Sequence, residues 1–537
     1  MEEYHHLLTG VTLTGLTLDQ KIGQMVMAQA FGRFRSSDAY EYKLLENLVT
    51  AYQVTGFKVY HGYCLGTAML ISHLNAKAPI PLLIASDLEM GLGQQIVDAP
   101  RFPPIASLGA AGDTGLANRA GYSIAQEALR LGINQIFAPL LDLHTKDDKY
   151  FGLRSIGNQT ELVSKIGSEF IKGVSRAGAI STAKYFPGNG DQVFCKDGST
   201  IVNKNRQRLR RREWLPFQSA IMAGVDAIMV SHSAYPFLDD TKWDSDAGTK
   251  PAALSQSIVK NILRDELGFE GLIVSDALNL PFLRKHNVRD IAFHACVAGC
   301  DLLVALTTPQ DAIDAIKGVY DALDQGMISE TQIDQSVQRI LNVKSKIKRD
   351  LFLGGQALDQ YSYAIGTDET IKIIEEIAKH SITLLRKPET GFPILNRPAS
   401  LTCLVIGQCK VLEQIQADPW QPWHKFQPIR NVTTQWMQVD PLKEDTLDMF
   451  LSDTDQPILI VLLQWDEKTR KKLDSYLNMI DEKNIRVILA LPISPNDAKS
   501  LSHRAWVSIW LPDFYQASRQ ALLSVIFGEC MPTGHLD

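Results

Sequence analysis

The sequence predicts an α/β protein, with a TIM-type (β/α)8 barrel followed by a smaller α/β sandwich domain. Short apolar runs alternate with helix-length segments over about 350 residues, as the repeating units of a parallel sheet do. Several runs are apolar at nearly every position, which is typical of strands that helices cover on both faces. Seven or eight such units favour closure into a barrel, and an open doubly wound sheet is the alternative.

The clearest unit lies between residues 254 and 276. Ser255 can cap a helix whose apolar residues recur at helical spacing, and Gly268 can end it. A tight turn leads into the apolar run 271–275, and Asp276 stands where this strand should end, either to cap the next helix or to carry chemistry. The candidate strands of the first domain are 56–60, 81–86, 136–141, 181–185, 227–231, 271–275 and 301–305, and helix-length segments among them are 116–132, 161–178 and 213–224.

A long helical pattern at 329–349 is expected to close the first domain. A stretch rich in Gly, Tyr and Gln follows and indicates a linker, after which buried-strand runs alternate again with helical segments. We therefore divide the chain into a barrel domain at 1–350, a linker at 351–370 and an α/β sandwich domain at 371–537. The candidate strands of that last domain are 401–407, 457–463, 485–490 and 505–510.

The composition describes a folded globular protein, because 45% of the 537 residues are hydrophobic and 21% are charged. A net charge of −6 is small for this length and argues against a nucleic-acid or anionic-membrane partner. The basic run 206–212 is interpreted as a solvated helix face. The sequence shows neither a membrane span nor a secretory signal, and seven cysteines without paired spacing favour a reducing, cytoplasmic setting.

Polar residues stand at the carboxyl ends of five consecutive candidate strands. In a parallel barrel these ends meet at one rim, so we expect a single active-site cleft there. A nucleotide site is not expected, because Gly91-Leu-Gly93 and Gly188-Asn-Gly190 lack the rest of a dinucleotide or phosphate-loop fingerprint. The rim residues are Asp87 and Glu89, Asp142 and His144, Lys184, His232 and Asp276.

Four segments carry a family resemblance. They are Asp-Leu-Glu-Met-Gly at 87–91, Gly-Leu-Arg-Ser-Ile-Gly at 152–157, Lys-Tyr-Phe-Pro-Gly-Asn-Gly-Asp at 184–191 and Val-Ser-Asp-Ala-Leu-Asn-Leu at 274–280. In this order they resemble the motifs of glycoside hydrolase family 3, and most closely its β-N-acetylglucosaminidase (β-hexosaminidase) branch. The resemblance covers roughly residues 18–345 and continues more faintly at 381–386 and 526–529.

The resemblance implies hydrolysis of a terminal β-linked N-acetylglucosamine, or of a related β-glycoside, with retention of configuration. Asp276 would be the nucleophile, and carboxylates and cations around it would bind the sugar hydroxyls. The reaction needs a carbohydrate substrate and no metal or organic cofactor. The residues expected to bind the substrate are Asp87, Arg154, Lys184, Tyr185 and His232.

The motif that carries the general acid/base departs from the family. In the acetylglucosaminidase branch this group is the histidine of an Asp-x-His pair, in the loop that follows the Lys-His-Phe-Pro-Gly-His-Gly segment. Here the loop 191–203 holds no histidine, and neither does any position from 145 to 231. The best match to the pair begins at Asp197, which could itself be the acid/base if a closed pocket raises its pKa. Glu413 or Glu467 of the second domain is the other candidate.

The same departure leaves a second class of function open. General acid/base help contributes a factor of about 10² to 10⁴, so a chain without it could bind sugar or cell-wall fragments as a sensor or scaffold. The retained Asp276, Arg154 and Lys184 favour an enzyme, with a phosphorylase or transglycosidase as a variant of the hydrolase. Together with a cytoplasmic setting, the branch resemblance suggests the recycling of peptidoglycan fragments. The sequence does not predict the oligomeric state.

Overall fold

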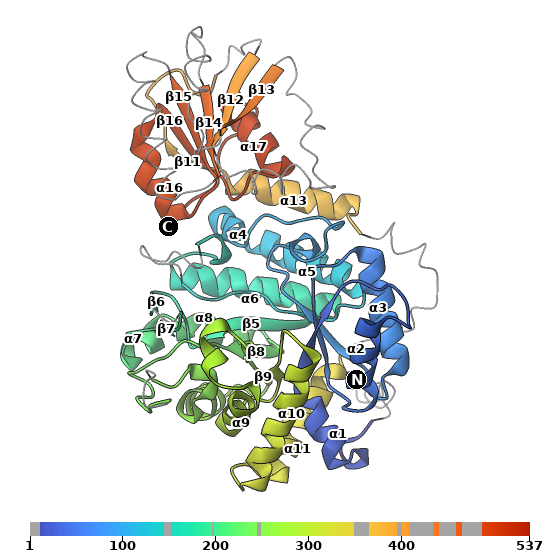
Figure 1. The fold of residues 1–537 in the computed structure, drawn as a ribbon. Helices are drawn as coiled ribbons and strands as arrows, with labels where there is room; N and C mark the ends of the chain where they lie inside the picture. Colours follow the sequence, from blue (N-terminus) through green and yellow to red (C-terminus); the bar gives the residue numbers. More distant parts are fainter. Residues whose placement is uncertain are drawn as a thin grey trace. The chain divides into compact units, whose positions relative to one another are not determined.

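The computed structural model describes residues 11–143, 152–195, 198–243, 249–347, 365–394, 400–406, 433–439, 458–463 and 486–536. The chain forms two compact units (Figure 1). The first consists of Met1–Pro100, Ala117–Asp148 and Asn158–Thr367, and the second of Arg101–Leu116, Lys149–Gly157 and Asp368–Asp537.

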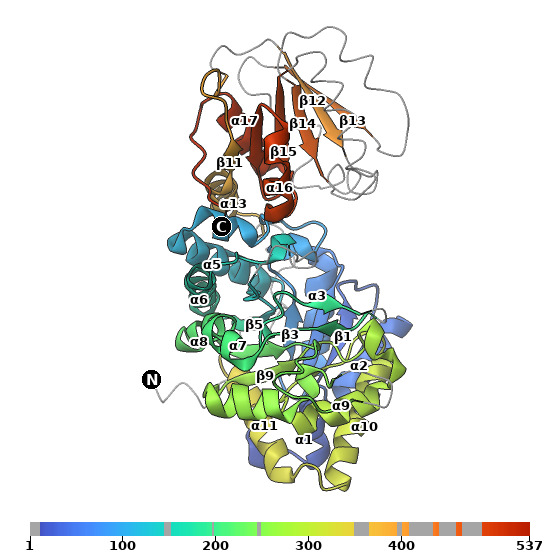
Figure 2. The ribbon, with the colours of Figure 1, turned by 90° about the vertical axis from the view of Figure 1, so that its left-hand side faces the viewer.

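The first unit is an eight-stranded parallel sheet in the order β10-β1-β2-β3-β4-β5-β8-β9. A parallel bridge between Val274 and Leu302 brings its two ends together, so the predicted (β/α)8 barrel is confirmed. Figure 2 shows its strands surrounded by helices. The strands are β1 (Val26–Phe31), β2 (Gly56–Tyr60), β3 (Leu83–Ser86), β4 (Gln135–Ile136), β5 (Ile180–Phe186), β8 (Ala227–Val230), β9 (Leu272–Ser275) and β10 (Leu303–Val304).

Strand β1 is missing from the strands that the sequence predicts. It follows α1 (Leu18–Gln24) after a single residue, so no separate loop marks the boundary between the helix and the strand. Thr17 caps the helix by accepting a hydrogen bond from the backbone N–H of Gln20 at 3.3 Å. Because β1 pairs with β10 and β2, it completes the barrel and adds one more strand end to the rim.

The helix, turn and strand that precede Asp276 follow in the predicted order. Ser255 Oγ accepts a hydrogen bond from the backbone N–H of Ile258 at 3.3 Å, and Gly268 follows the helix with a φ of +66°, a conformation that glycine adopts readily. The helices and 3₁₀ turns of this unit are η1 (Leu13–Gly15), α1, α2 (Tyr40–Thr50), α3 (Cys64–Lys77), η2 (Leu92–Gln94), α5 (Thr114–Arg130, all but its first three residues), α6 (Thr160–Ala177), α7 (Arg206–Arg211), α8 (Trp214–Met222), η4 (Ala252–Leu254), η5 (Ser257–Glu266), η6 (Pro281–Lys285), α9 (Val288–Ala298), α10 (Pro309–Asp324) and α11 (Glu330–Lys344).

The basic run at 206–212 forms α7. Arg208 pairs with Asp191 at 2.9 Å, and Arg206 pairs with Glu266. The side chains of both arginines are about half exposed. These contacts agree with the interpretation of the run as a solvated helix face.

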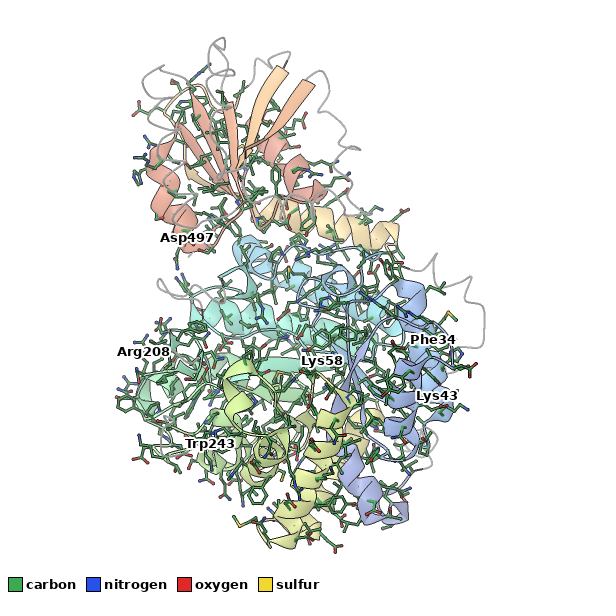
Figure 3. All side chains as sticks on the ribbon, viewed as in Figure 1. Phe34, Lys43, Lys58, Arg208, Trp243 and Asp497 are labelled. Atoms are coloured by element: carbon green, nitrogen blue, oxygen red, sulfur yellow. The ribbon has the colours of Figure 1, made fainter. Side chains whose placement is uncertain are left out.

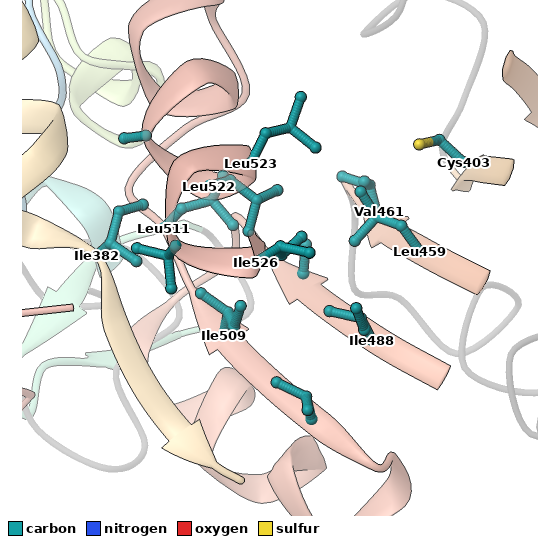
Figure 4. Close-up of a cluster of buried hydrophobic side chains, with 14 of the residues drawn as sticks. Ile382, Cys403, Leu459, Val461, Ile488, Ile509, Leu511, Leu522, Leu523 and Ile526 are labelled. Atoms are coloured by element: carbon teal, nitrogen blue, oxygen red, sulfur yellow. The ribbon is translucent and has the colours of Figure 1, made fainter. Parts of the chain in front are cut away.

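The second unit contains a six-stranded sheet in the order β11-β16-β15-β14-β12-β13, in which only β11 is antiparallel to its neighbour. Alternate residues of its strands face two separate hydrophobic clusters, as expected for a sheet covered by helices on both sides. Figure 4 shows the cluster on the side of α17. The elements are α13 (Asp368–Ser381), β11 (Thr383–Arg386), β12 (Ser400–Ile406), β13 (Thr433–Val439), β14 (Ile458–Leu462), β15 (Val487–Leu491), α16 (Pro495–Leu501), η9 (Ser502–Arg504), β16 (Val507–Trp510) and α17 (Gln516–Ile526).

Two short segments that the sequence division counted with the barrel belong to the second unit by their contacts. They contain α4 (Ala106–Ala111) and η3 (Gly152–Arg154). Ala106 and Leu153 pack in the same hydrophobic cluster as Trp510 of β16. The boundaries at 350 and 370 stay a prediction, and residues 351–364 of the expected linker lie outside the described residues. Among the described helices, none combines the length and the hydropathy that a membrane crossing requires.

Candidate active site

A cluster of buried charges occupies the interior of the barrel near the ends of β2, β3 and β5. Asp87, which directly follows β3, accepts a hydrogen bond from Nζ of Lys184 at 2.6 Å and is paired with Nζ of Lys58 at the same distance. The Lys184 side chain is fully buried, and those of Lys58 and Asp87 are 11% and 18% exposed. Figure 3 shows Lys58 near the middle of the unit. Three strands that are separate in the sequence therefore build one charged layer.

The electrostatics keep Asp87 and Lys58 ionised. Burial acts to raise the pKa of Asp87, but the adjacent charges of Lys184 and Lys58 hold it far below its usual range. Burial likewise acts to lower the pKa of Lys58, and the carboxylate of Asp87 together with Tyr60 raises it above its ordinary value. Asp87 is therefore a permanent hydrogen-bond acceptor and Lys58 a permanent donor, which suits the recognition of sugar hydroxyls.

Glu89 and Gln94 continue the cluster. Glu89 is buried and accepts a hydrogen bond from the Gln94 amide at 2.6 Å, while its other oxygen lies 2.9 Å from Nζ of Lys184. Lys184 thus contacts two carboxylates, and the layer of Asp87, Glu89, Lys58 and Lys184 carries no net charge. Such balance is what allows four ionised groups to stay buried.

Asp142, six residues after β4, holds the chain around the end of β5. Its carboxylate accepts hydrogen bonds from the backbone N–H groups of Tyr185, at 3.2 Å, and Asn189. The Asn189 amide oxygen in turn accepts a hydrogen bond from the Tyr235 hydroxyl at 2.5 Å. Tyr185 and Asn189 replace the two histidines of the family motif, and both are fixed by these contacts.

Asp276 follows β9, as the sequence predicts, and remains partly exposed. Its backbone N–H donates to the carbonyl of Val230 in β8 at 3.0 Å, and its Oδ1 accepts a hydrogen bond from the backbone N–H of Ala277 at 2.8 Å. Nε2 of His232 lies 3.1 Å from the Asp276 carbonyl oxygen. The backbone of Asp276 is therefore held at the rim by Val230 and His232, and its carboxylate is oriented by the backbone N–H of Ala277.

His232 is almost completely buried beside Asp276. Burial lowers its pKa below the ordinary value, although the charge of Asp276 opposes this effect, so the imidazole is neutral at pH 7. Nδ1 of His232 has no hydrogen-bond partner among the described residues. A neutral histidine with Nε2 as the donor fits its position against the Asp276 carbonyl, and it leaves Nδ1 as an acceptor.

Tyr60 at the end of β2 connects the charged layer with Asp276. Nζ of Lys58 lies 4.5 Å from the centre of the Tyr60 ring. Burial and the charges of Asp87 and Asp276 raise the pKa of the Tyr60 phenol, so it is protonated and able to donate a hydrogen bond. The charges of both carboxylates therefore act on the Tyr60 phenol.

The loop that should carry the acid/base forms a small hairpin of β6 (Val193–Phe194) and β7 (Thr200–Ile201). Gly198 N donates to the carbonyl of Cys195 at 3.0 Å, and a Cβ at Gly198 would lie 3.9 Å from Cβ of Phe282, in the segment after Asp276. The hairpin therefore extends toward the nucleophile segment. Asp197 itself lies outside the described residues.

The structure brings most of the predicted site residues together at one end of the barrel. Arg154 belongs to the second unit, and Glu413 and Glu467 lie outside the described residues, so the roles of these three stay predictions.

Sequence reasoning missed Lys58 and Tyr60, although a lysine inside an otherwise apolar strand was an available signal. Within the described ranges, no group of three or more His, Cys, Asp or Glu side chains is arranged to hold a metal. The residues that meet in the first unit are Asp87, Lys184, Tyr185, His232 and Asp276.

Comparison with known proteins adds three findings. The model of the glycosyl hydrolase family 3 N terminal domain matches residues 17–343. A β-N-acetylglucosaminidase/β-glucosidase of Cellulomonas fimi is 28% identical over 394 residues, which cover 71% of this chain and 67% of the relative. A β-hexosaminidase A of Pseudoalteromonas piscicida is 30% identical over 400 residues, which cover 69% of this chain and 66% of the relative, so the match spans about two thirds of each relative's length.

Among solved structures, a family 3 β-N-acetylglucosaminidase of Paenibacillus sp. FPU-7 superposes with a TM-score of 0.81 at 26% identity. The superposition covers 97% of this chain and 98% of that structure. A β-glucoside phosphorylase reaches a TM-score of 0.80 at 18% identity, which shows a shared fold.

Proposed function

Because the chain belongs to glycosyl hydrolase family 3, we propose that it hydrolyses terminal β-linked N-acetylglucosamine with retention of configuration. The observation that carries the mechanism is Asp276, a partly exposed carboxylate held at the barrel rim beside a neutral histidine and a protonated tyrosine. A pure binding site has no need of a carboxylate placed in this way.

In the first step the Asp276 carboxylate attacks the anomeric carbon. A C–O ester bond forms to the enzyme while the bond to the leaving oxygen breaks. Asp87 and Lys184 bind hydroxyls of the sugar, with Lys58 and Tyr60 as further donors, so that the anomeric carbon faces the nucleophile. Because this layer is ionised and rigidly paired, it requires little rearrangement when the sugar binds.

The leaving oxygen must receive a proton, and we assign this role to Asp197. Support comes from its place in the position of the family's Asp-x-His pair and from the adjacent Gly198, which approaches the segment after Asp276. In the second step Asp197 takes a proton from water, the water oxygen bonds to the anomeric carbon, and the ester to Asp276 breaks. An acid in the first step and a base in the second restore the enzyme.

The biological setting belongs to the same proposal. The seven cysteines show no paired spacing, which supports a reducing compartment.

The test is hydrolysis of 4-nitrophenyl β-N-acetylglucosaminide and β-glucoside by the wild type, Asp276→Asn and the exposed control Asp265→Asn. A 2-fluoro sugar and mass spectrometry then detect the glycosyl-enzyme. We expect the first substrate to be preferred, turnover to vanish only in Asp276→Asn, and the adduct to map to Asp276. Sugar binding without turnover or adduct would refute the hydrolase and favour the sensor.

The role of Asp197 has its own test. Asp197→Ala should reduce turnover by a factor of about 10² to 10⁴ for a poor leaving group and much less for 2,4-dinitrophenol, which leaves without a proton. Azide should restore activity by attacking the glycosyl-enzyme without base assistance. Equal losses for both leaving groups would assign the acid/base elsewhere.

A further inference from the structure

A cavity of about 320 Å³ lies beside the end of β1. Its walls come from β1, the loop 32–39, α2 and the residues that follow β10. Carbon atoms dominate these walls, and Phe31 and Tyr40 are 51% and 75% exposed. Aromatic side chains so open to water around a preformed hollow indicate a binding surface. The side chains used below are Phe31, Arg33, Phe34, Arg35, Tyr40 and Leu44.

The cavity adjoins the candidate active site through the register of β1 and β2. Gln29 in the cavity wall is the β1 partner of Lys58, and Phe31 is the partner of Tyr60. Partners in a parallel ladder lie about 5 Å apart and project their side chains from the same face. Gln29 and Phe31 therefore stand directly beside Lys58 and Tyr60, and Lys58 pairs with Asp87 of the candidate active site.

A second connection comes from β10. Thr307 lines the cavity, and its hydroxyl accepts a hydrogen bond from the amide of Asn279, three residues after Asp276. Thr307 has a φ of +107°, which a β-branched residue rarely adopts. The hydrogen bond between Asn279 and Thr307 therefore joins the cavity wall to the nucleophile segment.

The wall of the cavity is rigid. The Phe34 ring stacks on His73 with centroids 4.2 Å apart and meets Tyr42 edge-on at 5.5 Å. Figure 3 shows Phe34 beside the helices at the edge of the barrel. Nε of Arg33 donates to the carbonyl of His61 at 3.3 Å, which fixes the guanidinium on the cavity side of the loop. A preformed pocket of this kind binds without a large ordering cost.

The lining defines the chemistry of the occupant. A second sugar ring would need several polar partners, whereas Phe31, Phe34, Tyr40 and Leu44 offer apolar surface. The volume suits a single ring or a short acyl chain rather than an oligosaccharide. Arg33 and Arg35 outnumber the one acidic lining residue, Glu41, and a guanidinium binds a carboxylate through paired hydrogen bonds.

We propose that this cavity is the leaving-group site of the enzyme and that it takes an apolar, ring-sized aglycone carrying a carboxylate. The inference rests on the proposed hydrolysis. It identifies the chemical class of the aglycone, which is the part of the substrate that the barrel interior does not bind. Phe31 and Tyr40 contact the ring of the aglycone, and Arg33 and Arg35 bind its carboxylate.

The test uses the full chain and 1-thio-β-N-acetylglucosaminides, which bind without being cleaved, with methyl, phenyl and 4-carboxyphenyl aglycones. Dissociation constants are measured by calorimetry for the wild type, Phe31→Ala, Tyr40→Ala, Arg33→Gln and Arg35→Gln. Two matched controls replace exposed residues away from the cavity, Tyr122→Ala on α5 and Arg211→Gln on α7. Melting temperatures show which variants are folded.

We expect the wild type to prefer phenyl over methyl and 4-carboxyphenyl over phenyl. Each aromatic substitution should reduce the first preference about ten-fold, and each arginine substitution should reduce the second by a similar factor, since these contacts are worth about 1.4 kcal/mol each. The controls should keep both preferences. Because each preference is a ratio within one variant, a general weakening of sugar binding cancels.

Equal affinity of the wild type for all three aglycones, or preferences that survive in the folded cavity variants, would overturn the proposal. The corresponding oxygen glycosides separate this result from failure of the proposed function. Turnover without an aglycone preference refutes the leaving-group site alone. A preference in binding without turnover of any oxygen glycoside supports the site and refutes the hydrolase.

Discussion

Asp87→Asn is the sharpest perturbation of the charged layer, because it removes one charge and preserves the shape of the side chain. In the wild type, Asp87 faces the ammonium groups of Lys58 and Lys184, each at 2.6 Å. The amide leaves two cations in the barrel interior and removes one of the two carboxylates that Lys184 contacts, while Glu89 remains at 2.9 Å. The consequence should be a large loss of stability as well as of sugar binding.

The magnitude follows from the burial of these groups. Removing one partner of a buried ion pair costs about 3–5 kcal/mol, and the retained contact between Lys184 and Glu89 places Asp87→Asn at about 3 kcal/mol. The barrel unit has about 340 residues, so its unfolding entropy is roughly 0.7 kcal/mol/K. The melting temperature of that unit should therefore fall by about 4 °C.

Calorimetric melting of four proteins tests the reasoning: the wild type, Lys58→Met, Asp87→Asn and the double variant. Lys58→Met alone should destabilise, but in the Asp87→Asn background it should stabilise, since it removes an unpaired cation. Lys165→Met, which removes an exposed pair with Glu161, should melt like the wild type. A loss below about 1 kcal/mol in Asp87→Asn, or no change of sign for Lys58→Met, would refute the account of the layer.

The pH dependence has a defined sign. The folded pKa of Asp87 lies below its unfolded value of about 4, so the stability that its charge contributes is present above pH 4 and is lost as pH falls further. The difference between wild type and Asp87→Asn should stay constant from pH 7 to 5 and shrink below pH 4. A difference that grows in acid would contradict the assignment.

Three further predictions concern single residues. Tyr60→Phe should lower kcat/KM about ten-fold with an unchanged melting temperature, because it removes a hydrogen-bond donor beside the charged layer and Asp276, and steady-state kinetics would check this. The folded pKa of His232 lies below its unfolded value of about 6.5, so the stability that the neutral imidazole contributes to the fold is present above that pH and lost below it. In urea titrations His232→Gln should therefore lose less stability than the wild type between pH 7 and 5. Lys204→Met should cost about 3 kcal/mol in the same titrations, since it leaves the buried carboxylate of Glu213 without its partner at 2.8 Å.

Buried parallel strands were predictable because a continuous apolar run of four or five residues is typical of a strand covered on both faces. The run 227–231 and the run 271–275 became β8 and β9 almost to the residue. Strand β1 was not predictable in the same way, since its apolar residues continue those of α1 without a turn residue between them. The predicted run 136–141 shortens to β4, because Pro139 has no N–H with which to continue the ladder.

The site residues that belong to a sequence motif were predictable, and those that meet only because the barrel closes were not. Asp87 and Lys184 each stand in a family-like segment, yet their contact joins residues 97 positions apart. Lys58 belongs to no motif, and only the pairing of β2 with β3 brings it to Asp87. Residues that act through position alone cannot be recognised from one sequence.

The leaving-group cavity and the missing histidine bear on the same chemical step. An alcohol leaving group has a pKa near 16 and cannot depart without a strong acid, whereas a phenol, with a pKa near 10, needs much less help. A site that selects an aryl aglycone through Phe31 and Tyr40 therefore reduces the demand on the acid that replaces the histidine. The two proposals then predict an interaction: Asp197→Ala should cost least for the substrate that Arg33 and the aromatic residues bind best. Equal costs for alkyl and aryl glycosides would assign the acid/base to another residue and would remove this link between the two features.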